Sequence, residues 1–202
     1  MIKTSPMLDI RRTLEILPHA AAVHILEWRG ECREVLYILD YTVDKNIEQI
    51  PLTAAMIDDT GSILKSMTFT LGQEKDFTAR SGLPQKYLYE PGPAFQKAGG
   101  FNVMARKYNV TKLHPHTHLY TSAELIPGFP GRTFEIRDIF PAGIKKLPFS
   151  KANLAIRNFP GEVAALRKKL RLEDGGEDYV FACTLADESR VFIHGCKPLE
   201  NL

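Results

Sequence analysis

Residues 87–136 read YLYEPGPAFQKAGGFNVMARKYNVTKLHPHTHLYTSAELIPGFPGRTFEI. They fill most of the run from Tyr87 to Ile139, which joins the two halves of the sequence and decides the fold. A short aromatic strand is expected at Tyr87–Tyr89, and the Pro-Gly-Pro sequence after it ends the strand. A helix is expected next, because apolar or small residues recur at steps of three and four. These residues are Ala94, Ala98, Phe101, Ala105 and Tyr108.

The predicted helix contains a pair of glycines, Gly99 and Gly100. Each glycine in a helix costs about 1 kcal/mol relative to alanine, so close packing against another element is the first explanation for the pair. A phosphate-binding loop is disfavoured, because these glycines neither follow a strand nor open a helix. Beyond the helix, a histidine-rich connector and the aromatic piece Leu119-Tyr120 lead to a strand that opens at Thr133.

Strands and helices are expected to alternate in the sequence before this run. Strands are predicted at Met1–Lys3, Ala20–Trp28, Ile50–Ile57 and Met67–Leu71, and helices after Asp9 and at Glu31–Leu39. This order is typical of the second half of a doubly wound α/β sheet. The turn chemistry of residues 58–61 permits an antiparallel hairpin between the last two strands.

An α+β arrangement is expected after residue 84. Residues 72–84 are polar and predict a linker or an exposed loop. The elements beyond the central run are strands at 133–140 and 153–159, a helix at 160–170, and a hairpin formed by 179–185 and 190–196. Turn residues separate these segments, which supports the assignment.

Composition places the chain among ordinary globular proteins. Its 202 residues are 44% hydrophobic and 25% charged, and its formal net charge is +2. No apolar run approaches the ~20 residues that cross a bilayer, and we expect no membrane partner. The cysteines Cys32, Cys183 and Cys196 form no C-x-x-C pair, so free thiols in a reducing compartment, the cytoplasm, are expected.

The strings YLYEP, LHPHTHLYTS and FPGRTFEI, with the helix between them, resemble one bacterial family of class I S-adenosylmethionine-dependent methyltransferases. In that family a catalytic domain precedes a small ferredoxin-like domain and a C-terminal THUMP-like domain. The resemblance implies an α/β plus α+β fold. It places the C-terminal half of a Rossmann-like methyltransferase sheet at residues 1–75, a ferredoxin-like domain at 76–131 and a THUMP-like domain at 132–202.

The sequence has no G-x-G loop after a first strand. It also has no acidic residue placed some twenty positions beyond such a loop to hold a ribose. In the family, both features and the acidic catalytic motif lie upstream of the string that Lys3 begins here. We therefore expect this chain to be the C-terminal portion of a methyltransferase that is inactive alone. S-adenosylmethionine is the cofactor implied for the full-length protein, none is expected in this chain, and the catalytic residues remain unknown.

The segment KTSPMLDI at residues 3–10 resembles the family string KxSPMLDI. Ligands of open α/β sheets lie at the carboxyl ends of strands, and this segment leaves such an end. The resemblance implies that Ser5, Pro6, Met7 and Asp9 line the mouth of an active site. The alternative is a plain strand-to-helix turn in which Asp9 caps the helix.

Basic residues are concentrated between Lys145 and Arg171, where Glu162 is the one acid. The expected RNA-binding residues are Lys145, Lys146, Arg157, Arg167, Lys168, Lys169 and Arg171. A basic face on a chain of low net charge fits a nucleic-acid partner, with transfer RNA as the candidate that true THUMP domains suggest. The alternative is a solvated helix face that binds nothing.

The string His114-Pro115-His116-Thr117-His118 brings three imidazoles together, and imidazole suits zinc, copper or nickel. A closed metal site needs a fourth ligand, and no further Cys or His lies nearby in the sequence. The family pattern has another residue type at the position of His116. The favoured interpretation is that His114 and His118 form hydrogen bonds that position the connector, and no metal is expected.

Three hypotheses follow. The first is a portion of an RNA methyltransferase; the others are a non-catalytic RNA-binding module and a histidine-rich metal protein. We also expect the edge strand near Ile2 to be covered, first by a second copy of the chain. That homodimer would use the exposed edge of the N-terminal sheet, with Ile2, Val23, Ile25 or Leu26 at the contact.

Overall fold

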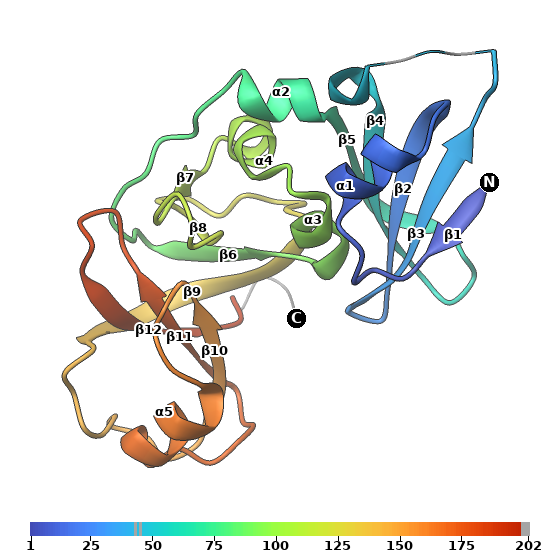
Figure 1. The fold of residues 1–202 in the computed structure, drawn as a ribbon. Coiled ribbons are helices and arrows are strands. Elements are labelled where there is room, and N and C mark those ends of the chain that lie inside the picture. Colours follow the sequence, from blue (N-terminus) through green and yellow to red (C-terminus); the bar gives the residue numbers. More distant parts are fainter. Residues whose placement is uncertain (43, 45, 199–202) are drawn as a thin grey trace. The chain divides into compact units, whose positions relative to one another are not determined.

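The computed structural model describes residues 1–42, 44 and 46–198, and these form two compact units (Figure 1). The first unit combines residues 1–79, 91–108 and 128–131, and the second combines 80–90, 109–127 and the rest of the chain from 132. Each unit is built on its own mixed sheet. Among the described residues, no helix has both the length and the apolar character that a bilayer crossing requires.

The first unit contains a five-stranded sheet in the order β1-β3-β2-β4-β5. The strands are β1 (Ile2–Thr4), β2 (Ala20–Trp28), β3 (Glu31–Leu39), β4 (Pro51–Ile57) and β5 (Ile63–Thr70). β2 and β4 are parallel, whereas the β1–β3, β2–β3 and β4–β5 pairs are antiparallel. The expected hairpin between the last two strands is confirmed, but most pairs in this sheet are antiparallel.

The helix expected at Glu31–Leu39 is wrong, because this segment is β3. Arg29 and Gly30 have φ of 50° and 75°, and Trp28 pairs with Glu31 across them. Two successive left-handed residues make the tight turn whose twist suits a β-hairpin. Val35 and Tyr37 are both fully buried, at the spacing of two that a strand requires.

The described helices of the first unit are short. They are α1 (Ile10–Ile16), the short 3-10 helix η1 (Ile47–Gln49), α2 (Leu71–Lys75), α3 (Pro93–Ala98) and α4 (Phe101–Tyr108). The linker or exposed loop expected at residues 72–84 is wrong at its start, because α2 extends to Lys75. Thr70 and Gln73 form a reciprocal capping box that begins α2.

The single helix expected across Gly99 and Gly100 is two helices. Gly99 ends α3 in the left-handed conformation, with φ of 78°. A Cβ on Gly100 would lie 2.6 Å from the ring of Phe69 on β5, so the expected close packing is confirmed there. Next to these helices, the buried carboxylate of Glu27 accepts the backbone N–H of Ala94, 3.2 Å away.

The second unit contains a seven-stranded sheet in the order β10-β11-β12-β9-β6-β8-β7. Its strands are β6 (Tyr87–Pro91), β7 (Thr111–Lys112), β8 (Tyr120–Ser122), β9 (Gly131–Pro141), β10 (Asn153–Arg157), β11 (Asp178–Thr184) and β12 (Arg190–Cys196). Helix α5 (Val163–Leu170) packs Leu166 and Leu170 into the cluster that contains Val180 and Ala182. Phe181 belongs to a second cluster, as the alternation of side chains along β11 requires.

Two expectations about buried residues are decided here. Val23 and Ile25 have no exposed surface, so of the four residues expected at a contact with another copy of the chain only Ile2 and Leu26 remain. β1 pairs with β3 of its own sheet and stands at one end of the strand order.

All three cysteines are free, but only Cys183 is buried, and burial raises the pKa of its thiol to about 12.

Candidate functional site

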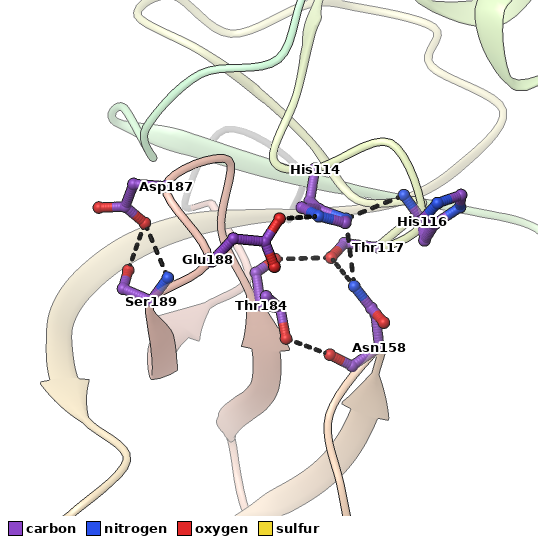
Figure 2. Close-up of polar contacts among 8 residues, drawn as sticks. All are labelled: His114, His116, Thr117, Asn158, Thr184, Asp187, Glu188 and Ser189. Carbon is purple, nitrogen blue, oxygen red and sulfur yellow. Dashed lines mark hydrogen bonds and ion pairs between the residues drawn. The ribbon is translucent and has the colours of Figure 1, made fainter.

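The histidine-rich connector takes part in a network of polar contacts in the second unit (Figure 2). The buried ring of His114 has its Nδ1 3.0 Å from the backbone nitrogen of His116 and 3.1 Å from the amide nitrogen of Asn158. Its Nε2 lies 3.0 Å from Oε1 of Glu188. A backbone N–H can only donate, so Nδ1 accepts and the neutral ring carries its proton on Nε2. His114 therefore donates to Glu188.

Two further bonds tie the same three chain segments together. The hydroxyl of Thr117 donates to the carbonyl of Thr184 over 2.6 Å, and the hydroxyl of Thr184 donates to the carbonyl of Asn158. Thr117 and Thr184 are buried, so these bonds satisfy polar groups that water cannot reach. The connector, the end of β10 and the end of β11 are thus fixed relative to one another.

Glu188 reaches His114 from an unusual backbone position. It lies in the loop between β11 and β12, where the N–H of Leu185 donates to the carbonyl of Ser189 over 2.9 Å. Asp187 accepts from the N–H of Ser189 in the same loop, at 3.0 Å. Glu188 has φ of 64°, a conformation that favours glycine or asparagine. Asn158 is also left-handed, with φ of 53°.

A cavity of about 770 Å³ opens beside this network. Its walls are His114, Pro115, His116, Asn158, Phe159, Pro160, Thr184, Glu188 and Arg190. The volume is within the ~300–1,000 Å³ of small-molecule sites. The imidazole of His116 is exposed and the ring of Phe159 is half-buried, while Glu188 and Arg190 supply opposite charges at exposed positions. The cavity can therefore offer flat faces, hydrogen-bond acceptors and one cation.

The three imidazoles of the connector differ in exposure, since His114 is buried, His116 is exposed and His118 is intermediate. Burial is the main reason that the pKa of His118 is lowered to about 4, so this ring is neutral at pH 7. Across the described part of the chain, no group of three or more His, Cys, Asp or Glu side chains has the arrangement of a metal site. The positioning role expected of His114 is confirmed by its three contacts.

The structure divides the expected RNA-binding residues into a set with partners inside the second unit and a set that is exposed. Arg157 belongs to the first set, because it contacts Glu90, whose side chain is only 3% exposed and which Arg132 also contacts. Arg167 donates to the carbonyl of Ala152 over 3.1 Å and contacts an acid beyond the helix, Asp174. These guanidinium groups hold the second unit together.

Lys169 is intermediate between the two sets, since it is exposed but donates to the carbonyl of Ala142 over 2.9 Å. Lys145, Lys146, Lys168 and Arg171 are all exposed. Arg171 ends α5 in the left-handed conformation. We call these four residues the basic set, and they are the positions best placed to meet a phosphate backbone.

The segment from Ser5 to Asp9 is a strand-to-helix turn. Asp9 accepts the N–H of Arg12 over 2.8 Å and caps α1, and Ser5 accepts the N–H of Met7 over 3.2 Å. Met7 and Asp9 also line a cavity of about 480 Å³ that neither Ser5 nor Pro6 lines. The helix cap of the alternative interpretation is therefore confirmed, and the lining of an active site by these residues stays a prediction.

Sequence reasoning missed Asn158, Thr184, Glu188 and Arg190. A usable signal existed only at Asn158, because asparagine between a strand and Phe159-Pro160 is typical of a left-handed turn position. Glu188 gives no local signal, since 74 positions separate it from His114. Only the pairing of β11 with β12 brings it to the connector.

Comparisons with known proteins agree with this architecture. Residues 87–130 match a family model described as a ferredoxin-like domain, and residues 131–196 match one described as THUMP domain-like. No curated protein matches the sequence. The fold matches the crystal structure of a "putative methyltransferase" from Porphyromonas gingivalis W83, with a TM-score of 0.86 and 32% identity over 96% of this chain. The match spans 50% of that protein. The chain therefore contains ferredoxin-like and THUMP-like segments, and its fold matches about half of that structure.

Proposed function

We propose that this chain is part of a methyltransferase that acts on RNA, and that its THUMP-like segment holds the RNA. The observation that carries the proposal is the shared fold over nearly the whole chain with the Porphyromonas gingivalis protein, at 32% identity. The match of residues 131–196 to a THUMP-like model supports the part of the proposal that concerns RNA binding. In such an enzyme the five-stranded sheet contributes to the catalytic domain and the second unit to substrate binding.

The basic set supplies the chemistry for RNA binding. Lys145, Lys146, Lys168 and Arg171 are exposed cations, and cations near phosphates release condensed counterions when RNA binds. This term is independent of sequence, so it anchors the RNA and leaves the choice of base to other groups. Transfer RNA is the substrate class that we propose to test first.

The cavity beside β1 does not have the lining that S-adenosylmethionine needs. The cavity at the end of β1 is lined by apolar side chains together with Thr4, Asp9, Arg12 and Thr13, and by no glycine. Asp9 is already engaged as the cap of α1. A dinucleotide-type or adenosyl site needs backbone N–H groups freed by glycine and an unengaged carboxylate for the ribose. We therefore place the cofactor, and the catalytic residues, outside the residues of this chain.

Fluorescence anisotropy with labelled transfer RNA tests the RNA part of the proposal. Four neutralised phosphates predict a loss of about two orders of magnitude in affinity between about 50 and about 200 mM salt. Replacing all four members of the basic set with glutamate should remove most binding. The matched control carries the same charge change at Lys3, Arg12, Arg106 and Lys107, which are exposed in the first unit. Equal effects of both variants would show that net charge alone matters, and would refute the assigned surface.

A non-catalytic RNA-binding module is the second candidate, and the match of residues 131–196 to a THUMP-like model is the observation that favours it. Methyl transfer from S-adenosylmethionine by the chain alone would exclude it.

Self-association through the edge of β1 remains a separate prediction, in which Ile2, 36% exposed, lies at the contact. Light scattering at several protein concentrations checks it, and a monomer at all of them would refute it.

A further inference from the structure

Hydrogen bonds among its own residues hold the walls of the cavity beside His114 in place. The ring of His114 is held by His116, Asn158 and Glu188 through contacts of 3.0–3.1 Å. The bonds of Thr117 and Thr184 lock the surrounding chain segments (Figure 2). Walls fixed before binding lose little conformational entropy when a ligand enters.

Two side chains of the cavity offer flat faces. His116 is exposed, and its ring contacts that of His114 at a tilted angle, with 5.5 Å between the centroids. The ring of Phe159 contacts that of Phe192, also tilted and with 5.5 Å between the centroids. Aromatic and histidine rings are the surfaces on which unpaired nucleotide bases stack. Adjacent prolines add apolar wall without competing polar groups.

The polar groups left over are mainly acceptors. Both hydrogens of the Asn158 amide nitrogen face partners, Nδ1 of His114 and the hydroxyl of Thr117, which leaves its amide oxygen as an acceptor. Figure 2 shows this oxygen on the side of the amide away from both partners. The carboxylate of Glu188 accepts from His114 through Oε1 only, and its side chain is 78% exposed.

We propose that this cavity binds one unpaired nucleotide of RNA whose base presents N–H donors, guanine above all. Guanine presents a ring N–H and an amino group on one edge, which suits a carboxylate, whereas uracil presents one N–H between two carbonyls. Arg190 provides a cation for the phosphate. The inference rests on the proposed RNA function and deepens it, because it names the site that selects a base.

Titration of the 202-residue chain with guanosine and uridine monophosphate tests the site directly, with the histidine ring signals followed by NMR. Saturable shifts of the His114 and His116 rings are expected with the guanosine nucleotide, and weaker ones with uridine. In anisotropy, a short oligouridine that carries one guanine should bind more tightly than oligouridine alone. His116→Ala should weaken the guanine-containing oligomer about fivefold or more, through lost stacking.

Glu188→Gln is the sharper variant, because it keeps the shape and the contact with His114 but places an amide donor beside the base. It should bring the affinity for the guanine-containing oligomer down to the affinity for oligouridine, so that the ratio of the two falls to about one. Glu177→Gln, at an exposed position of the same unit, is the control that should change neither. Circular dichroism and thermal unfolding confirm that the variants fold.

The outcomes separate the two proposals. If transfer RNA binds through the basic set while the His116 and Glu188 variants leave oligomer binding and nucleotide shifts unchanged, the nucleotide site is wrong and the RNA function stands. If guanosine monophosphate shifts the His114 and His116 rings but no RNA binds, the RNA function fails and the cavity remains a nucleotide site. If no nucleotide or RNA of any kind binds, both fail.

Discussion

Nε2 of His114 lies 3.0 Å from Oε1 of Glu188, across 74 positions of sequence. His114 is 7% exposed, and its other ring nitrogen accepts from His116 and faces Asn158. One imidazole therefore joins the connector, the end of β10 and the loop between β11 and β12. Because every polar atom of the ring has a partner, His114 holds the cavity in shape and is not available as a general base.

Replacing His114 should destabilise the chain. His114→Ala removes a buried ring together with its hydrogen bonds to His116, Asn158 and Glu188, and a hydrogen bond of this kind contributes about 0.5–1.5 kcal/mol. Urea unfolding should show this as a lower midpoint at an unchanged slope. The neighbouring His116→Ala, at an exposed position, should change the free energy of unfolding by no more than about 0.5 kcal/mol. Equal effects of the two variants would contradict the assigned role.

Glycine at position 100 should be required by packing. In Gly100→Ala the new Cβ would lie 2.6 Å from the ring of Phe69, which is buried and cannot move away freely. Overpacking of this kind costs about 1–3 kcal/mol. Gly143→Ala is the matched control, because nothing lies within 4 Å of its Cβ and its φ is not positive. Thermal unfolding of both variants checks the prediction, and it fails if Gly100→Ala is as stable as the control.

The buried carboxylate of Glu27 should make stability depend on pH. Burial raises its pKa above the ordinary value of 4.5, and the hydrogen bond from Ala94 opposes the shift only in part. A raised folded-state pKa gives stability that is complete below the ordinary value and is lost as pH rises through the raised one. Glu27→Gln should therefore gain stability relative to the natural chain as pH rises from about 4.5 toward neutrality.

Urea midpoints of the Glu27→Gln variant and the natural chain, measured at several pH values, give this difference directly. Glu31→Gln is the control, since Glu31 is exposed on the adjacent strand and should produce no such trend. A constant difference between Glu27→Gln and the natural chain across the range would mean that Glu27 is charged as readily in the folded state as in the unfolded one.

The chain alone should bind S-adenosylmethionine no more than weakly. The cavity at the end of β1 has no glycine in its walls, and its one acid, Asp9, caps α1. Isothermal calorimetry checks the prediction. Saturable one-site heat with a dissociation constant in the low micromolar range would overturn the placement of the cofactor outside these residues.

Much of the local structure was determined by the sequence. The strands at 20–28, 133–140 and 190–196 follow from apolar runs of strand length between turn residues, and all three are confirmed. Asp9 caps α1 because a carboxylate there satisfies free N–H groups of the first turn, a relation within a few residues. Residues with strong local preferences form the same structure in many settings, so their patterns can be interpreted without the fold.

The tertiary structure decided what depends on distant partners. Glu31–Leu39 has apolar residues at both helical and strand spacings, and pairing with β2 on one side and β1 on the other selected the strand. Arg157 was expected to face RNA, but a buried acid on β6, Glu90, holds it within the second unit. The cavity needs His114, Asn158 and Glu188 together, and only the sheet brings them together. Hydrogen bonds and charge pairs act over a few ångströms in space, and spacing along the chain does not report that distance.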